Sequence, residues 1–330
     1  MSTIVDVAKL AQVSRVTVTR VLNEPEKVKP ETRLRVEKAI ATLNYVPNLS
    51  ARSLVSKSSG VIGMLVPDNV SGFFGSVMST VHKQVNARGK MLMVLECADR
   101  DEEENALRKL NEINCDGFLL YVRHVDTEKI KSYTGSKPVV LLDASSISDI
   151  PSVSFEHYQA AYAATSKLIG QGHHKIAIVA GPDDRPSAIK RFNGCLDAIC
   201  QAGLPWDPGY SMSGPYDQIF GESATFALLE KKPDISALVY SSERACSGGL
   251  RALRRLGRRV PEDISVISFD SFGLTEYLSP HIDSVIYPVS AMAEYGVKEV
   301  ITRVFNKDYQ MCSQEFTHYF VEGESINPLS

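Results

Sequence analysis

The chain has 330 residues, 44% of them hydrophobic, and a formal net charge of −3. This length supports two or three domains with a sizeable core. No apolar run approaches the roughly 18 residues of a membrane helix, and the polar residues near the N-terminus argue against a signal peptide. The six cysteines form no C-x-x-C pair, so we expect reduced thiols in a cytoplasmic protein without a metal or cofactor.

The first residues predict two short helices joined by a tight turn. Thr3 and Asp6 have the spacing of a capping box that opens the first helix. Ser14 is a good N-cap for the second helix, whose apolar residues are spaced to face inward. This layout indicates a helix-turn-helix, which places its second helix in the major groove of DNA, although a surface helical hairpin has the same pattern. The outer face of the second helix then carries Arg15, Val16, Thr17 and Arg20.

Charge separates this region from the rest of the chain. A third helix is predicted from Pro30 to Asn44, with apolar residues at helical spacing. Residues 1–58 hold ten basic and five acidic residues, a net charge of +5, which leaves 26 basic and 34 acidic residues, a net charge of −8, in residues 59–330. A basic N-terminal part on an acidic body is expected when only that part meets DNA phosphates.

From residue 60 onward the pattern alternates between apolar strands and amphipathic helices. This alternation predicts an α/β fold with two doubly wound parallel sheets. The expected strands are Val61–Val66, Met91–Glu96, Gly117–Val122, Val139–Leu142, Lys175–Ala180, Ala237–Tyr240, Ser265–Phe269 and Ser284–Tyr287. The expected helices include Gly75–Arg88, Asp101–Asn114, Tyr158–Gly170, Ser187–Ala202 and Ala245–Leu256.

An enzyme is the first alternative, because two α/β lobes also occur in sugar hydrolases and kinases. The chain contains no G-x-x-x-x-G-K-[ST], no G-x-S-x-G and no strand-linked G-x-G-x-x-G motif. The adjacent pair Asp183-Asp184 is better explained as a solvated loop than as an acid and base. A sugar-binding transport protein is the second alternative, but it would not carry a basic helix-turn-helix. We therefore expect no enzymatic activity.

The whole chain resembles the LacI/GalR family of bacterial transcription regulators. In the N-terminal part the matching motifs include Val5-Asp6-Val7-Ala8, Val13-Ser14, Arg20-Val21-Leu22-Asn23 and Leu43-Asn44-Tyr45-Val46-Pro47-Asn48. Two strand segments of the body also match: the stretch from Gly172-His173 to Gly181, and the stretch from Val260-Pro261 to Asp270.

The resemblance implies a domain organisation and an assembly. It implies a helix-turn-helix headpiece over residues 1–46, a hinge helix and linker over 47–59, and a periplasmic-binding-protein-like core over 60–330. One lobe of this core would take residues 60–156 and 288–316, and the other 157–287 and 317–330. A near-palindromic operator requires two headpieces, so we expect a homodimer, and the C-terminus shows no heptad tail that would make a tetramer.

The family pattern also implies DNA-contacting residues. We expect Arg15, Val16 and Arg20 to read base edges, and Ser14, Thr17 and Asn23 to hold phosphates. The hinge would add Ala51, Arg52 and Leu54, with Leu54 wedged into the minor groove.

A small-molecule effector is expected in the cleft between the lobes. The resemblance implies an aromatic wall and polar contacts at strand ends: Phe73, Phe74, Asp143, Arg185, Ser187, Arg191, Tyr216, Ser242 and Asp270. Ser242-Glu243 and Glu156-His157 depart from the usual family residues, so no relative's effector can be transferred. Arg123-His124, after the strand Gly117–Val122, is expected to be a solvated strand end, with one more polar contact to the ligand as the alternative. We expect a sugar that releases the protein from DNA; a purine-type co-repressor and a sugar phosphate remain alternatives.

Overall fold

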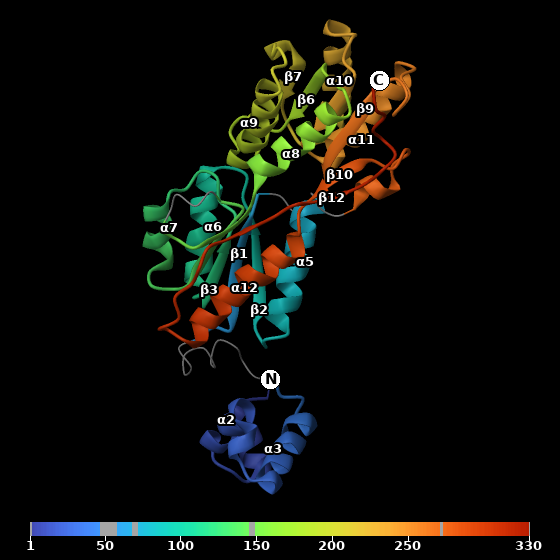
Figure 1. The fold of residues 1–330 in the computed structure, drawn as a ribbon. Coiled ribbons are helices and arrows are strands. Elements are labelled where there is room, and N and C mark those ends of the chain that lie inside the picture. The colour runs from blue at the N-terminus through green and yellow to red at the C-terminus, as the bar shows by residue number, and fades with distance from the viewer. Residues whose placement is uncertain (1, 47–57, 68–71, 145–148, 271–272, 330) are drawn as a thin grey trace. The chain divides into compact units, whose positions relative to one another are not determined.

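The computed structural model describes residues 2–46, 58–67, 72–144, 149–270 and 273–329. The chain divides into two compact units, the N-terminal unit (residues 1–59) and the core (residues 60–330), shown in Figure 1. Within the described residues, no helix is both long and apolar enough to cross a membrane. The expected fold class is confirmed: helices form the N-terminal unit, and two largely parallel sheets form the core.

The N-terminal unit packs three helices around small apolar side chains. The helices are α1 (Ile4–Ala11), α2 (Arg15–Asn23) and α3 (Pro30–Thr42), with a 3-10 turn, η1 (Pro25–Lys27), before α3. Each helix contributes one fully buried valine, namely Val7, Val18 and Val36. Short side chains at these positions let the three helices approach closely.

The helix starts follow the caps expected from the sequence. The Thr3 hydroxyl accepts the N–H of Asp6, and the Asp6 carboxylate accepts the N–H of Thr3 at 2.9 Å, which completes the capping box of α1. The Ser14 hydroxyl accepts the N–H of Thr17 at 3.1 Å and caps α2. Gln12, with a φ of 53°, ends α1 in the left-handed conformation and directs the chain into the turn.

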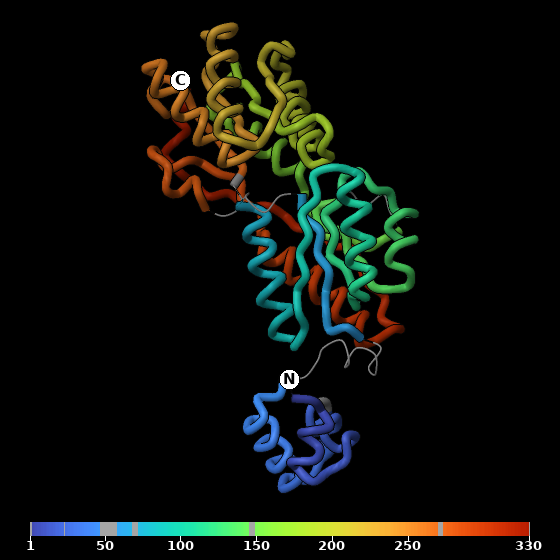
Figure 2. The backbone as a smooth tube through the Cα atoms, turned by 180° about the vertical axis from the view of Figure 1, so that it is seen from behind, coloured from blue at the N-terminus to red at the C-terminus, as the bar shows by residue number. Residues whose placement is uncertain are grey.

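The first lobe of the core contains a six-stranded parallel sheet in the order β11-β5-β4-β3-β1-β2. Helices α5 and α12 pack on one face, where they bury alternate residues of β1, and α6 and α7 pack on the other face (Figures 1 and 2). The strands are β1 (Val61–Val66), β2 (Met91–Glu96), β3 (Gly117–Leu120), β4 (Val139–Leu142), β5 (Ser152–Phe155) and β11 (Gln314–Phe316). The helices are α5 (Gly72–Asn86), α6 (Arg100–Glu112), α7 (Thr127–Thr134) and α12 (Val289–Phe305).

The second lobe repeats this plan with the strand order β12-β10-β9-β8-β6-β7, in which only β12 is antiparallel to its neighbour. Helices α8 and α9 cover one face, and α10 and α11 cover the other. The strands are β6 (Ile176–Ala180), β7 (Ser211–Ser213), β8 (Ala237–Tyr240), β9 (Ser265–Asp270), β10 (Asp283–Ile286) and β12 (Tyr319–Val321). The helical elements are α8 (His157–Gly170), α9 (Pro186–Gln201), α10 (Gln218–Lys231), α11 (Glu243–Arg255) and the 3-10 turns η2 (Pro208–Tyr210) and η3 (Leu274–Tyr277).

The chain crosses between the lobes three times, at residue 156, at residues 287–288 and at residues 317–318. Two of these crossings are packed together, because the rings of Phe155 and Tyr287 stack with their centroids 4.6 Å apart. Short crossings of this kind allow two lobes to change their mutual angle while each keeps its own core.

Candidate functional site

The outer face of α2 exposes the residues that the sequence assigned to DNA. Arg15, Val16 and Arg20 are exposed, and Val16 is 67% exposed although it is apolar. The opposite face of the helix is fixed in the core through Val18 and Val21. Within the described residues, neither the Arg15 nor the Arg20 guanidinium has an ion-pair partner. This helix therefore presents two cations and an apolar side chain on a rigid support.

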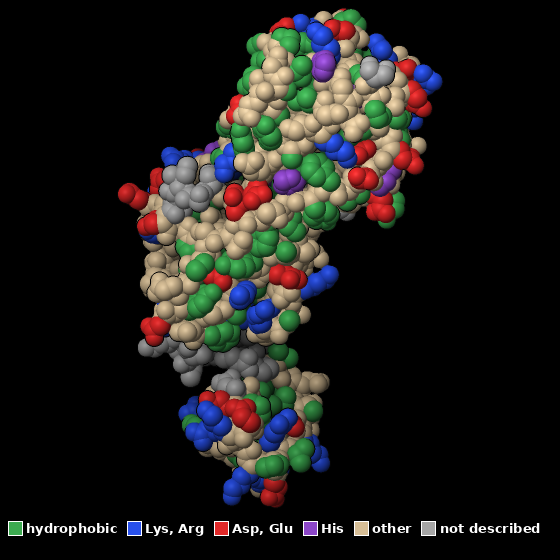
Figure 3. Space-filling model, viewed as in Figure 1, with side chains coloured by type: hydrophobic (Ala, Val, Ile, Leu, Met, Phe, Trp, Pro, Cys, Tyr) green, Lys and Arg blue, Asp and Glu red, His purple; other side chains and the backbone are tan. Residues whose placement is uncertain are grey.

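Three of the five acids of the N-terminal unit are engaged with neighbouring groups. The Asp6 carboxylate belongs to the capping box, Glu24 pairs with Lys27 at 3.0 Å, and Glu37 pairs with Arg33 at 2.6 Å. In contrast, basic and acidic side chains are interspersed over the face of the core seen in Figure 3, which offers no extended basic surface there. The geometry of α2 suits contacts to phosphates and base edges.

Six of the sequence-predicted DNA contacts need separate comment. The Ser14 and Thr17 hydroxyls lie 2.9 Å apart at the start of α2, within the cap. Asn23 ends α2, but its side chain is not described. Ala51, Arg52 and Leu54 lie outside the described residues.

A cavity of about 430 Å³ lies where the carboxyl ends of strands from both lobes face each other. That volume is in the range of small-molecule sites. Eight of the nine residues that the sequence assigned to the effector line it: Phe73, Phe74, Asp143, Arg185, Ser187, Arg191, Tyr216 and Ser242. The ninth, Asp270, ends β9, and its side chain is not described. Residues that the sequence did not assign to the effector also line the cavity: Tyr121, Arg123, Pro182, Asp184, Pro215, Asp217, Ser241, Glu243, Arg244 and Phe269.

Arg191, on α9, is held at the cavity by hydrogen bonds and aromatic rings. Its Nη1 donates to the Ser241 carbonyl at 2.7 Å, and its Nε donates to His157 Nδ1 at 3.3 Å. The guanidinium carbon lies 4.9 Å from the ring centre of Phe269 and 5.2 Å from that of Tyr287. Flat aromatic faces hold the guanidinium in one plane, which prepares it for a bidentate contact with a ligand.

His157 joins the two lobes beneath Arg191. Its Nε2 lies 2.7 Å from the Asp143 carboxylate, which follows β4 of the first lobe, while His157 itself begins α8 of the second lobe. Its Nδ1 lies 3.1 Å from the Tyr287 hydroxyl. Burial lowers the pKa of His157, against the attraction of Asp143. Since Nδ1 accepts the Arg191 N–H, the network assigns the proton to Nε2, where it donates to Asp143.

Aromatic rings form the apolar wall of the cavity. Phe74 meets Phe73 and Tyr121 edge to face, with ring centroids 4.9 Å and 4.8 Å away. On the opposite lobe, the Tyr216 ring lies directly on Gly181, where a Cβ would stand 2.2 Å from the ring. Only glycine fits at that strand end, so Gly181 makes room for the tyrosine.

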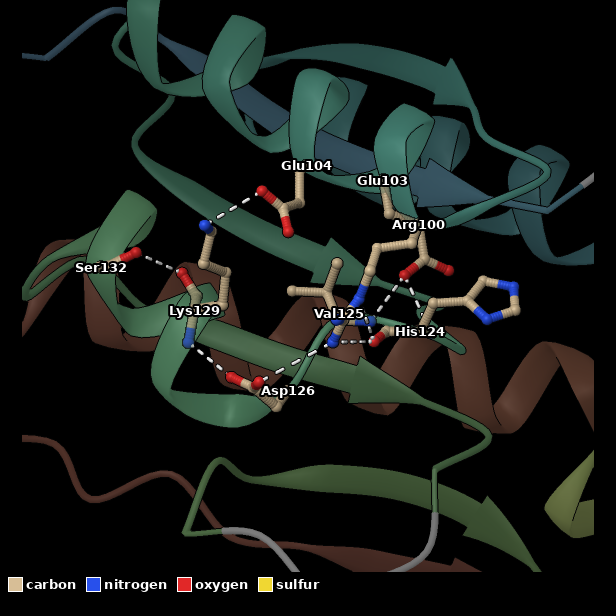
Figure 4. Close-up of polar contacts among 8 residues, drawn as sticks. All are labelled: Arg100, Glu103, Glu104, His124, Val125, Asp126, Lys129 and Ser132. Carbon is tan, nitrogen blue, oxygen red and sulfur yellow. Dashed lines mark hydrogen bonds and ion pairs between the residues drawn. The ribbon is translucent and has the colours of Figure 1, made fainter.

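Arg123 lines the cavity, and a buried carboxylate holds its loop. Figure 4 shows this carboxylate, Glu103, beside His124 and Val125 of the loop. Glu103, on α6, is 1% exposed and accepts three successive backbone N–H groups, those of Arg123, His124 and Val125, at 2.8, 3.0 and 2.9 Å. Arg100 closes the loop from outside by donating to the His124 carbonyl at 2.9 Å. The expectation that Arg123 is solvated is therefore wrong: it is half-buried and lines the cavity.

Two family models match the chain, and together they cover both units. Residues 3–48 match the model of bacterial regulatory proteins of the lacI family. Residues 59–292 match the model of periplasmic binding proteins and the sugar-binding domain of the LacI family.

Individual relatives and structures agree with these matches. The transcriptional regulator AscG of Escherichia coli (strain K12) is 32% identical over 92% of this chain and 91% of its own length. Catabolite control protein A of Priestia megaterium is 32% identical over 93% of each chain. A solved complex of the transcriptional regulator CelR with cellobiose is 27% identical, covers 98% of this chain and 100% of its own, and has a TM-score of 0.74.

These relatives are transcriptional regulators and not enzymes, and their similarity extends over nearly the full length of the sequence. The helix-turn-helix with its exposed cations and the two-lobed core with its polar cavity are the two parts that such a regulator needs. The chain belongs to the LacI family of bacterial DNA-binding transcriptional regulators.

Proposed function

We propose that this regulator is a cytoplasmic repressor that leaves its operator when a small sugar or sugar derivative fills the core cavity. One observation carries the proposal: the same chain holds α2, with its exposed Arg15 and Arg20, and a cavity that combines aromatic walls with the fixed guanidinium of Arg191. Rings that cover the apolar face of a sugar, together with a planar donor for its hydroxyls, form a common carbohydrate site. The cellobiose held by the similar CelR supports a sugar over a purine.

The operator contacts follow from the exposed face of α2. Arg15, Val16 and Arg20 read base edges in the major groove, and Ser14, Thr17 and Asn23 fix the register on phosphates. Ala51, Arg52 and Leu54 would contact the minor groove, with Leu54 as the wedge at the centre of a near-palindromic site. Two copies of α2 are needed for such a site, so the acting species is a homodimer.

The switch acts through the lobes. Ligand groups that contact Arg191 of the second lobe and Phe73 and Phe74 of the first would favour one angle between the lobes. The bond between Asp143 and His157 already joins the two lobes at this point. A change of that angle alters how the two copies of α2 meet DNA, which couples the cavity to the operator.

Two matched arginine variants test the proposal. Arg191→Ala should abolish the ligand-induced rise in melting temperature and leave operator binding intact in a gel-retardation assay. Arg15→Ala should do the reverse: it should cost about 1–3 kcal/mol of specific binding and relax the preference at one base position. The DNA is the sequence upstream of the gene, and the ligands are a panel of sugars, sugar phosphates and nucleobases.

The outcomes separate the alternatives. If a nucleobase tightens operator binding, the effector is a purine-type co-repressor and not a sugar inducer. If Arg191→Ala keeps the full ligand response, the cavity is not the effector site. If the wild-type protein shows no operator shift with or without any ligand, the proposed repressor function fails.

A further inference from the structure

Three buried polar atoms belong to residues that line the cavity and have no hydrogen-bond partner within the described residues. They are Nε of Arg123, Nε of Arg185 and the hydroxyl of Tyr216. Arg123 follows β3 of the first lobe, whereas Arg185 and Tyr216 belong to the second lobe. Burying a donor without a partner costs free energy, so these atoms mark where a ligand supplies acceptors from both sides.

The two arginines also lack carboxylate partners. The Arg123 Nη2 donates to the Ala98 carbonyl at 3.1 Å, a neutral acceptor. The Arg185 guanidinium lies over the Tyr216 ring, with its carbon 5.5 Å from the ring centre. Within the described residues neither guanidinium forms an ion pair. A half-buried cation next to aromatic rings gains more from an anion than a solvated one does.

The carboxylates of the same cavity are mostly engaged with the protein. Asp143 accepts from His157, and Asp217 accepts the N–H of Phe220 at 2.8 Å as the cap of α10. Glu243 is 6% exposed and also has a partner within the protein. Asp184 is exposed and reaches solvent. Among the described side chains, four carboxylates and four arginines line the cavity, and the buried groups without a partner there are donors on Arg123, Arg185 and Tyr216.

Tyr121 lines the same cavity as Arg123 and Arg185. Burial raises the pKa of Tyr121, the Asp143 charge adds to that rise, and the guanidinium groups of Arg185 and Arg123 oppose it. Both arginines thus act on a single hydroxyl, although they come from opposite lobes.

We propose that the effector of this regulator is acidic: a sugar-sized polyol that carries a carboxylate or a phosphate monoester, whose anionic group is bound between Arg123 and Arg185. The proposal rests on the proposed function, because it assigns a ligand class to the same cavity. The guanidinium groups of Arg123 and Arg185 would bind the acid, and Tyr216 would donate its hydroxyl. Arg191 is left for the hydroxyls of the polyol. An anion bound by residues of both lobes would favour the angle at which the two lobes lie closer together.

The first test uses inorganic phosphate as a probe of the anion site in the full-length protein. Phosphate replaces chloride at constant ionic strength, and the melting temperature is measured. The wild type should gain stability with phosphate in the millimolar range. Arg123→Met and Arg185→Met should each weaken the apparent affinity about 10- to 100-fold. The control is Arg254→Met, an exposed residue near the end of α11 that does not line the cavity and should behave like the wild type.

The second test identifies the acid. Neutral sugars are compared with their matched sugar acids and sugar phosphates, for example glucose with gluconate and glucose 6-phosphate, by melting temperature and by operator release. Stronger effects of the sugar phosphates assign a phosphate monoester, and stronger effects of the sugar acids assign a carboxylate. Either result should be lost in Arg123→Met and Arg185→Met.

Contrary outcomes are distinct from failure of the proposed function. If neutral sugars release the operator and their acidic counterparts do not, the acidic effector is wrong and the repressor function stands. If phosphate has no stabilising effect, or if both arginine variants keep it, the anion site is wrong. If Arg191→Ala retains the response to every compound, the cavity itself is not the effector site.

Discussion

At the scale of single residues, His157 makes the core sensitive to acid. Burial lowers its pKa below the ordinary value of 6.5, and the positive charges of Arg191 and Lys190 act in the same direction, while Asp143 opposes them. The unfolded chain therefore takes up this proton at a higher pH than the folded chain does. The free energy of unfolding should be at its full value above pH 6.5 and should fall below it, by up to about 1.4 kcal/mol per pH unit for this one group.

The measurement is chemical unfolding between pH 5 and 8 for the wild type and for His157→Gln. Burial also lowers the pKa of His173 and of His318. The wild type and His157→Gln both keep these two residues, so their effect cancels in the difference between the two unfolding free energies. We expect the wild type to lose more stability than His157→Gln below pH 6.5. Identical slopes in the two proteins would show that His157 does not carry the effect.

Residues at strand ends could be predicted from the sequence, and residues that act through a distant partner could not. Asp143 and Arg191 were assigned to the cavity because they follow strands and match family positions. Glu103 stands in a run of acidic residues that looks solvated throughout, and nothing local shows that this one carboxylate turns inward to the loop before α7. The inward position of Arg123 follows from that buried contact, so the sequence alone placed it in solvent.

At the scale of elements, the loop between β3 and α7 depends on α6. The Glu103 carboxylate offers two oxygens to three N–H groups, so replacing one oxygen by an amide NH2 would set a donor against a donor (Figure 4). Glu103→Gln should destabilise the core by about 1–3 kcal/mol. It should also lower the affinity for the effector, because the loop that positions Arg123 is no longer fixed.

A control and a double variant separate positioning from general loss of stability. Glu104, the next residue on α6, is more exposed and pairs with Lys129 at 3.0 Å, so Glu104→Gln should change little. If Glu103 acts through Arg123, then adding Arg123→Met to Glu103→Gln should cause no further loss of affinity in calorimetric titration. Fully additive losses would contradict a positioning role.

Strands that read as apolar runs were easier to predict than the three-residue strands. Buried strands such as β1 and β4 read as continuous apolar runs, and their bounds match the sequence analysis. The three-residue strands β7, β11 and β12 lie at or near sheet edges and carry polar residues, so they give no periodic signal. In addition, β11 pairs with β5 from a distant part of the chain, a contact that only the tertiary fold determines.

At the scale of the whole molecule, the two units are stabilised separately. The N-terminal unit has its own cluster of small apolar side chains, and the core has three larger clusters, one of which includes residues of both lobes. The change of net charge near residue 58 already indicated this division in the sequence. In contrast, the three crossings between the lobes could be predicted only from the family resemblance, because helical and strand periodicity cannot show which sheet a strand joins.

The separate cores lead to a prediction about residues 60–330 expressed alone. This fragment should keep the melting temperature and the ligand-induced shift of the full-length core, because its three clusters include no residue of the N-terminal unit. It should lose operator binding completely, since α2 is absent. A fragment that unfolds at a clearly lower temperature than the full-length core would contradict independent stability.

The same fragment tests where the dimer forms. Large apolar side chains are exposed on the second lobe, with Ile219 and Tyr277 at 81% and 83%, and Met91 is 50% exposed on the edge strand β2 of the first lobe. Exposed apolar groups and an unpaired strand edge are typical of surfaces that a partner covers. We expect both proteins to sediment as dimers at micromolar concentration, and Ile219→Lys with Tyr277→Lys to shift the fragment toward monomer, because each copy would bury an unpaired ammonium. A fragment that sediments as a monomer, beside a dimeric full-length protein, would place the dimer contacts in the first 59 residues instead.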